Sequence, residues 1–176
     1  HWGGANDGIL RGPVTEIGFV VHKDHFDRPK GRAAIRDVRL CRNDTPPQVP
    51  LDIAKFDASK ATVNGQASIR KEKDALIIEI PGGQSFTWPG VNLKPQNGGS
   101  YFDLSGGSVL AMDVTNLAGY PATFRCQIEN LGADGREFCV KGGRGFEAGE
   151  TATMRIRFYR DGIAPDDVVF EGVLNP

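Results

Sequence analysis

Trp88 is the residue whose type and position most directly suggest a chemical role. It lies in the sequence QSFTWPG at 84–90, after a glycine-containing turn and before a proline. Aromatic rings on loops or on outer sheet faces stack against sugar rings, whose C–H faces are apolar. Trp88 is therefore a candidate carbohydrate contact. The alternative is that its ring covers one end of the hydrophobic core.

Two stretches place long polar side chains at alternate positions, as on the outer face of a strand. Arg125, Gln127 and Glu129 alternate in one stretch, and Arg155, Arg157 and Tyr159 alternate in the other. If the two strands are neighbours, they form a polar face suited to sugar hydroxyls, or to sulfate or carboxylate groups. The alternative is a solvated face with cross-strand ion pairs. The candidate carbohydrate-binding residues are thus Trp88, Arg125, Gln127, Arg157 and Tyr159.

Metal-binding and catalytic signals are weak. His22 and His25 lie three residues apart beside Asp24 and Asp27, but two histidines without a clear third ligand match a solvated loop better than a metal site. The Glu-x-Asp-x-x-Glu strand pattern of jelly-roll glycosidases, the Gly-x-Ser-x-Gly motif and the P-loop do not occur. We therefore expect a protein that is not an enzyme. A small polysaccharide lyase or hydrolase remains an alternative.

The elements that must position these residues are predicted to be β-strands. Apolar and polar residues alternate with period two in four segments: 76–80, 110–115, 124–129 and 152–159. This pattern is typical of antiparallel strands with one buried and one solvated face. No segment has convincing helical periodicity. Loops are expected at 43–50, 81–84, 96–100, 132–136 and 142–145, and Tyr101 and Phe102 are expected to pack in the core or at an edge.

Composition supports a globular, strand-rich protein. The chain has 176 residues, with 23 glycines, 11 prolines and 39% hydrophobic residues, which fits many short strands joined by turns. The net charge of −1 gives no electrostatic attraction to nucleic acid or to an acidic membrane. No apolar run approaches the roughly 18 residues of a membrane helix.

The three cysteines do not predict an easy disulfide. Cys126 shares a strand face with Phe124 and Ile128, whereas Cys139 alternates out of phase with its apolar neighbours Phe138 and Val140. A bridge between Cys126 and Cys139 would need a bulge to bring them to one face. Whether they are bridged stays open, and Cys41 has no obvious partner.

The order of the segments is unusual. Residues 17–22 and 33–40 look like the closing strands of a sandwich, although they come first, while 56–158 looks like its start and middle. No internal repeat is found, which favours one domain with shifted ends over a slice across two tandem modules. We expect residues 1–176 to form a single all-β antiparallel sandwich in which the order of the strands along the chain is circularly permuted.

The proline-rich stretch 43–50 (NDTPPQVP) is the expected join. It would connect the closing-strand segment 1–42 to the opening-strand segment 51–176. In that arrangement the strand at 35–40 lies beside a strand that begins near Phe56, and the two chain termini lie close together.

Several short motifs resemble a known family. They are Pro89-Gly90-Val91, Gly98-Gly99, YFDLS at 101–105, LAMDVTN at 110–116, ENLGADG at 129–135 and GET at 149–151. Together they resemble the carbohydrate-binding-module-like β-sandwich of β-agarases and related polysaccharide-degrading enzymes. The resemblance covers about two thirds of the chain, and its motifs are structural more than catalytic.

The resemblance implies a jelly-roll sandwich that is secreted and acts beside a catalytic domain. Some relatives bind polysaccharide, and others mainly pack on their catalytic partner. The expected function is therefore a non-catalytic carbohydrate-binding module, with a packing domain as the alternative. The resemblance also implies a structural Ca²⁺ at Asp37 and Asp57, with Asp52 nearby. No nucleic-acid or membrane partner is expected.

Overall fold

The computed structural model describes residues 9–10, 14–20, 30–42, 45–48, 51–96, 102, 104, 109–130 and 139–160. Within them the regular structure is β-strand apart from two short 3-10 helices, which confirms the all-β prediction. Several residues considered above lie outside this part of the chain, namely His22, Asp24, His25, Asp27, Tyr101 and the loop 132–136. No described helix has the length and apolar character needed to cross a bilayer.

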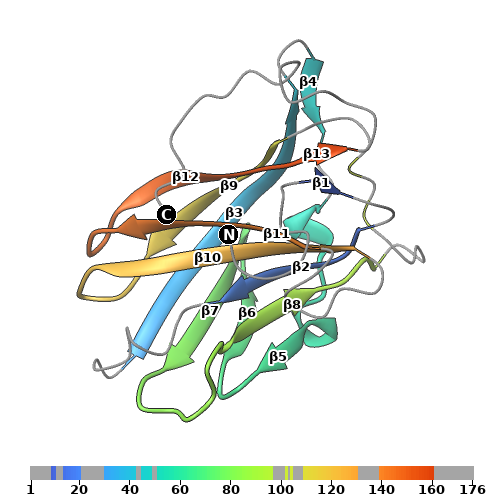
Figure 1. Ribbon diagram of the computed structural model, residues 1–176. Coiled ribbons are helices and arrows are strands. Elements are labelled where there is room, and N and C mark those ends of the chain that lie inside the picture. The colour runs from blue at the N-terminus through green and yellow to red at the C-terminus, as the bar shows by residue number, and fades with distance from the viewer. Residues whose placement is uncertain are drawn as a thin grey trace.

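Two antiparallel sheets form a β-sandwich (Figure 1). The five-stranded sheet contains β2 (Val14–Val20), β5 (Thr62–Asn64), β8 (Gly90–Leu93), β10 (Ala122–Asn130) and β11 (Cys139–Phe146), in the order β11–β10–β2–β8–β5. The six-stranded sheet contains β3 (Lys30–Arg42), β4 (Thr45–Gln48), β6 (Ser68–Glu72), β7 (Ala75–Pro81), β9 (Val109–Asn116) and β12 (Thr151–Arg157). Its order is β12–β9–β3–β7–β6, and β4 pairs with β3.

The alternation in the sequence places the core between the sheets. Ile17, Leu110, Ile128 and Ile156 are each 0% exposed and belong to one continuous cluster. Phe102 is also buried in this cluster, as expected. Burying such side chains contributes roughly 1.5–3 kcal/mol each, so the period-two pattern is the main reason that these segments form strands.

The N-terminal strands occupy the centre of both sheets. β2 separates β8 from β10 in one sheet, and β3 separates β7 from β9 in the other. The strands from 51–96 therefore lie on one side of each central strand, and the strands from 109–157 lie on the other. Without β2 and β3 neither sheet would be continuous.

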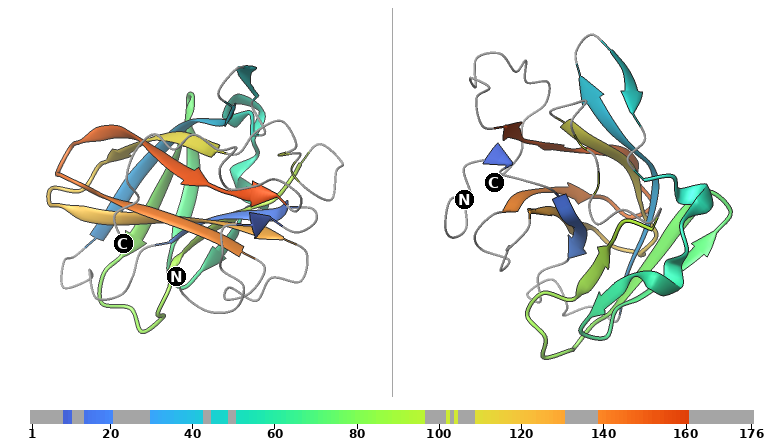
Figure 2. Two further views of the ribbon diagram at one scale, coloured as in Figure 1. Left: turned by 45° about the horizontal axis from the view of Figure 1, so that its top comes forward. Right: turned by 90° about the vertical axis from the view of Figure 1, so that its right-hand side faces the viewer.

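Segments near the two ends of the chain lie side by side. β1 (Ile9–Leu10) pairs in parallel with β13 (Tyr159–Arg160), as Figure 2 also shows. This pairing agrees with the expected closeness of the termini as far as the described residues extend.

The stretch 43–50 is more than a connection. Its middle, β4, folds back on β3 with Leu40 opposite Gln48 and Arg42 opposite Thr45. Proline is tolerated here because β4 lies off the main path of the sheet, where a missing backbone N–H breaks no central ladder. Residues Thr45–Gln48, the described part of this stretch, are thus extended, as predicted, and form a strand.

Two other sequence predictions are wrong. Residues 142–145, expected to be a loop, lie within β11. Glycine fits there because a Cβ on Gly143 would come within 2.9 Å of Arg125 Cγ on β10. No strand begins at Phe56, which lies between η2 (Ile53–Lys55) and η3 (Ala58–Lys60), and the partners of β3 are β4, β7 and β9.

Asn116 explains the DVTN motif in structural terms. This asparagine is 0% exposed, and its Nδ2 donates to the carbonyl oxygens of Tyr120 at 2.8 Å and Glu147 at 3.0 Å. Its Oδ1 accepts from the backbone N–H of Ala118 at 3.0 Å. One buried side chain therefore ties the β9–β10 turn to the β11–β12 turn.

The side chains of Cys126 and Cys139 are not bridged to each other and lie on opposite faces of the five-stranded sheet. Cys126 pairs across the ladder with Gly142 and belongs to the core, whereas Cys139 pairs with Glu129 on the outer face. The argument from strand parity is confirmed. Burial raises the pKa of the Cys126 thiol, which keeps it protonated and unreactive.

Candidate ligand-binding face

The outer side of the five-stranded sheet gathers most of the polar residues that the sequence singled out. We define the five-strand face as the outward side chains Glu16, Gly18, Val20, Asn92, Arg125, Gln127, Glu129 and Lys141, with Lys94 and Trp88 at its ends. Cross-strand partners point to the same side of a sheet, and the register places Gln127 opposite Gly18 and Gly18 opposite Asn92. Their sequence neighbours form the core, so this side faces outward.

Trp88 and Arg125 form one end of the five-strand face. Trp88 is 36% exposed, and the Arg125 guanidinium carbon lies 5.4 Å from the centroid of its ring. Such a cation–π contact is worth roughly 0.5–2 kcal/mol and holds the ring in one orientation. The structure thus brings together Trp88, Arg125 and, on the same strand as Arg125, Gln127.

Gly90 allows the Trp88 loop to reach this position. A Cβ at Gly90 would lie 2.0 Å from the carbonyl oxygen of Phe19, so no larger residue fits between β8 and β2. The loop that carries Trp88 therefore enters β8 tight against the central strand. Phe86, in the same loop, is 47% exposed, and its Cβ lies near Gly65.

Two amides flank a bare glycine at the centre of the face. Asn92 Nδ2 donates to Glu16 Oε2 at 2.7 Å, and Gln127 Nε2 donates to Glu129 Oε1. Asn92 Oδ1 lies over Gly18, 3.0 Å from where a Cβ would stand. With its nitrogen engaged by Glu16, Asn92 presents its amide oxygen beside Gly18.

A pair of carboxyl groups lies beside the amides. Glu16 on β2 is directly opposite Glu129 on β10 in the antiparallel ladder. Lys94 Nζ is 3.0 Å from Glu16 Oε1. Burial raises the pKa of Glu129, and the negative charge of Glu16 raises it further, while the Gln127 amide and the Lys141 charge act in the opposite direction.

Arg157 and Tyr159 do not join this face. Arg157 belongs to β12 of the six-stranded sheet, and Tyr159 belongs to β13, while Arg125 and Gln127 belong to β10. The polar face shared between these strands, which the sequence predicted, does not form. The physical reason is that the turn at 147–150 carries the chain from β11 in one sheet to β12 in the other.

The outer side of the six-stranded sheet, which we call the six-strand face, is covered by ion pairs. Glu79 forms ion pairs with Arg32 at 3.0 Å and with Arg70 at 3.2 Å. Asp113 is held by both terminal nitrogens of Arg39, at 3.3 and 3.2 Å, and by the Thr153 hydroxyl at 2.7 Å. This is the solvated, ion-paired surface that was the alternative to a binding face.

The two aspartates expected at a calcium site have other local roles. Asp37 lies in a bulge of β3 with φ 51°, and its carboxylate contacts Arg39. Asp57 caps η3 by accepting from the Ser59 N–H at 3.0 Å and the Ser59 hydroxyl at 2.7 Å.

These roles do not fit a shared calcium ion. A neighbouring arginine disfavours a cation at Asp37, and no three His, Cys, Asp or Glu side chains in the described ranges gather as metal ligands. Asp52 likewise caps η2 and pairs with Lys55 at 3.0 Å. We derive no role for calcium from these residues.

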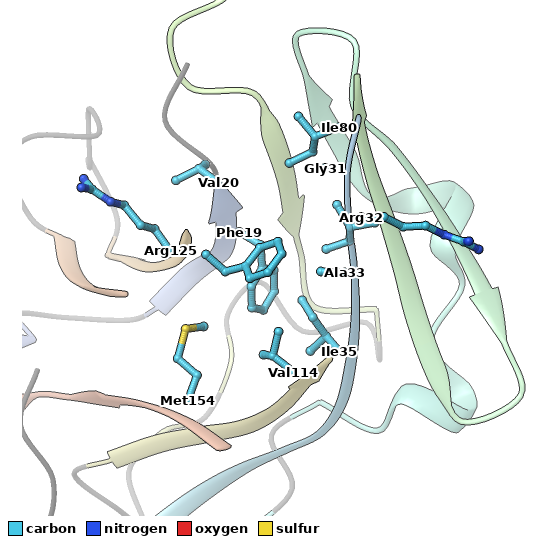
Figure 3. Close-up of a pocket in the computed structure, with 12 residues that line it drawn as sticks. Phe19, Val20, Gly31, Arg32, Ala33, Ile35, Ile80, Val114, Arg125 and Met154 are labelled. Carbon is cyan, nitrogen blue, oxygen red and sulfur yellow. The ribbon is translucent and has the colours of Figure 1, made fainter. Parts of the chain in front are cut away.

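A cavity of about 20 Å³ between the sheets is part of the core packing. Figure 3 shows it between Phe19, Ile35, Val114 and Met154, with the guanidinium groups of Arg125 and Arg32 directed away from it on opposite sides. Its volume suits at most a single water molecule. It is not a site for an organic ligand, and the heads of the two arginines belong to the two outer faces.

Four residues of the five-strand face were missed by the sequence reading: Glu16, Asn92, Lys94 and Lys141. Each occupies an outward position of its strand, and Glu16 alternates with Gly18 and Val20 in β2, a strand that the sequence pattern could predict. What was lacking is the strand order, which places β2 between β10 and β8.

Compared with protein-family models, with curated proteins and with solved structures, the chain matches none of them. Its function must therefore be argued from its own residues.

Proposed function

We propose that the protein is a non-catalytic carbohydrate-binding module that holds a polysaccharide on the five-strand face. The observation that carries the proposal is Trp88, partly exposed and held by Arg125, beside a row of amide and charged side chains. Sugars are bound by stacking on an aromatic ring and by hydrogen bonds to planar polar groups. The proposed contacts are Asn92 and three of the candidate residues that the sequence predicted, namely Trp88, Arg125 and Gln127.

The test is a polysaccharide binding screen by affinity electrophoresis and calorimetry, using agarose, porphyran, carrageenan, alginate and plant glucans. Trp88→Ala should weaken binding about tenfold. Phe86→Ala is the matched control, because Phe86 is an exposed aromatic of the same loop whose Cβ lies near Gly65. Absence of binding to every glycan, or equal losses in both variants, would contradict the proposal.

A hydrolase is a second candidate because Glu16 and Glu129 are two carboxyl groups on one face. Glycosidases place two carboxyl groups on either side of the scissile bond, whereas Glu16 and Glu129 are direct cross-strand neighbours and each already accepts from an amide. Binding is therefore favoured over hydrolysis. Release of reducing sugar from the same glycan panel, lost in Glu16→Gln, would reverse that preference.

A packing domain is less well supported. It would need a large apolar patch on one outer face, and the large hydrophobic side chains exposed among the described residues are Val63, Phe86, Trp88 and Leu117. They come from an edge strand, one loop and a turn rather than from one sheet face. The proposal also includes a catalytic domain in the same parent protein and a secreted location.

We further propose that the sandwich is a jelly roll with a permuted order. The central positions of β2 and β3 and the pairing of β1 with β13 support this reading. A gene that joins residue 176 to residue 1 through a glycine-rich linker and opens the chain between 48 and 51 should give a folded protein. A permuted chain that does not fold, although the original order does, would contradict it.

A further inference from the structure

The guanidinium of Arg125 is not neutralised by the part of the protein that the structure describes. Among those residues it has no hydrogen bond or ion pair, and its guanidinium carbon lies 5.4 Å from the centroid of the Trp88 ring. Other arginines are paired with carboxylates: Arg32 with Glu79, Arg39 with Asp113, Arg70 with Glu72, and Arg144 with Glu150. Arg125 therefore keeps a charge that an acidic group from outside could neutralise.

The hydrogen-bond donors of Arg125 are open to solvent. None of its nitrogens belongs to the buried polar atoms that lack a partner in the described part of the chain. Figure 3 shows its guanidinium directed away from the core. A cation–π contact engages the positive charge and leaves the N–H donors without a hydrogen bond. Trp88 thus holds the guanidinium in place while its donors remain available to a ligand.

Short side chains flank Arg125 across the sheet. The register places Gly143 on one side of it and Val20 on the other, and Gly90 is opposite Val20 on the next strand. A Cβ at Gly143 would lie 2.9 Å from Arg125 Cγ, so glycine leaves room for the arginine stem. No carboxyl group lies in this cross-strand row. The row therefore offers no internal partner that competes with an anion for the guanidinium.

The acids of the five-strand face lie at its other end. Glu129 is four residues further along β10 than Arg125, which corresponds to about 13 Å of strand. Glu129 accepts from Gln127, and its cross-strand neighbour Glu16 pairs with Lys94 at 3.0 Å. The face thus has a cationic end at Arg125 and an acidic end with partners of its own. An anionic group is favoured only at the cationic end.

We propose that Trp88 and Arg125 form a subsite for a sugar residue that carries a sulfate or carboxylate group, so that the preferred ligand is an anionic polysaccharide. This inference rests on the proposed carbohydrate-binding function and names its ligand class. The exposed part of the Trp88 ring packs against the C–H face of the sugar. The guanidinium donates two N–H groups to two oxygens of the anion, a geometry that both sulfate and carboxylate accept.

The experiment measures the dissociation constant of the full chain by calorimetry at low ionic strength, with two matched pairs of probes. One pair is a carrageenan oligosaccharide and its desulfated form, and the other is an alginate oligosaccharide and its carboxyl-reduced form. Wild-type protein should bind at least one anionic probe about tenfold more tightly than its neutral counterpart. The pair that shows the difference identifies sulfate or carboxylate as the group, and added sodium chloride should reduce the difference.

Three variants separate the subsite from a general attraction between charges. Arg125→Gln should bind the two members of each pair equally and keep its affinity for the neutral probe within about threefold. Arg125→Lys keeps the charge without the planar pair of donors, so its preference should be intermediate. Arg155→Gln is the matched control, because Arg155 is an exposed arginine of β12 on the six-strand face. It should keep the full preference, and circular dichroism establishes that each variant is folded.

The failure of this inference can be distinguished from the failure of the proposed function. Equal wild-type affinity for both members of each pair overturns this inference alone, because binding of the neutral probes still supports a carbohydrate-binding module. A preference that survives in Arg125→Gln, or that Arg155→Gln loses to the same extent, overturns it as well. If the wild type binds none of the four probes and no glycan of the wider panel, the proposed function falls together with this inference.

Discussion

The two outer faces of the sandwich differ in how they treat their carboxyl groups. On the six-strand face each principal acid meets an arginine, as Glu79 meets Arg32 and Arg70, and as Asp113 meets Arg39. On the five-strand face Glu129 meets another acid, Glu16, directly across the ladder. Opposite charges across strands stabilise a sheet, and like charges destabilise it. The ion pairs of the six-strand face therefore stabilise its sheet. The repulsion between Glu16 and Glu129 destabilises the other sheet, which indicates that the five-strand face has a role other than stability.

The faces also differ in their apolar content. Ala34, Ala75 and Ile77 form a small buried cluster on the outer side of the six-stranded sheet, so the apolar side chains of that surface are covered. The five-strand face has glycine at its centre and an exposed tryptophan at its end. A surface with an exposed aromatic ring beside polar side chains is the one suited to a ligand.

The largest effect is expected where the five-strand face needs a bare backbone. Gly90→Ala places a methyl group 2.0 Å from the Phe19 carbonyl oxygen, which must force β8 away from β2 and lower the free energy of unfolding by about 3 kcal/mol or more. Urea denaturation measures this. Gly145→Ala in β11, where nothing lies within 4 Å of the new Cβ, should stay close to wild type. Equal stability of both variants would break the comparison, because the close approach that places Trp88 would be wrong.

The next effect is the pH dependence of stability on the five-strand face. The folded-state pKa of Glu129 is raised, by burial first and then by Glu16. Its stabilising contribution is therefore fully present below the ordinary glutamate pKa and is lost as pH rises through the raised value. Glu129→Gln should remove this loss and exceed wild type by about 1 kcal/mol above that window. Urea denaturation across pH checks it, and an identical pH slope in the variant would rule it out.

The six-strand face should show the opposite sign. Partial burial opposes ionisation of Asp113, but hydrogen bonds from Arg39 and Thr153 and the charge of Arg39 outweigh it and lower its pKa. Its contribution is therefore present above the ordinary aspartate pKa of 3.8 and is lost as pH falls through the lowered value. Asp113→Asn should cost about 0.5–1 kcal/mol at neutral pH, a modest figure because solvent screens the pair. The deficit should shrink in acid, and glycan binding should not change. A deficit that grew in acid would contradict the assignment.

The smallest effect concerns the cysteines, which test the assignment of sides. Cys126 points into the core and Cys139 points to the five-strand face, so the two should not form a bridge with each other. Adding a reductant should leave the melting temperature unchanged, and mass spectrometry after thiol labelling of the unfolded chain should find both cysteines alkylated. A Cys126–Cys139 disulfide would show that the strand register, and hence the composition of the face, is wrong.

Individual strands and their sides were predictable because their signal is local. In β9, β10 and β12 alternation assigned the buried Met112, Ile128 and Met154 to the core, although it placed Ala111, which is also buried, on the outer face. The outward parity of Arg125 and Gln127 follows from the same pattern. β4 and the middle of β11 were missed because proline and glycine usually mark turns, and here a sheet edge and a close cross-strand contact accommodate them instead.

Neighbour relations between strands were not predictable in the same way. The sequence grouped Arg125 with Tyr159, whereas the structure separates their strands and brings Arg125 to Trp88. Backbone ladders carry little sequence information of their own, so the order of strands is decided by loop paths and by how the two sheets close over one core.

The sequence by itself determined that this chain is an all-β protein, which residues its strands bury, and that Cys126 and Cys139 face opposite ways, because side-chain parity along a strand is a property of the local backbone. The tertiary structure alone decided that β2 and β3 stand at the centres of the sheets and that Glu16 meets Glu129. Those contacts join segments far apart in the chain, and only the packing of the whole sandwich brings them together.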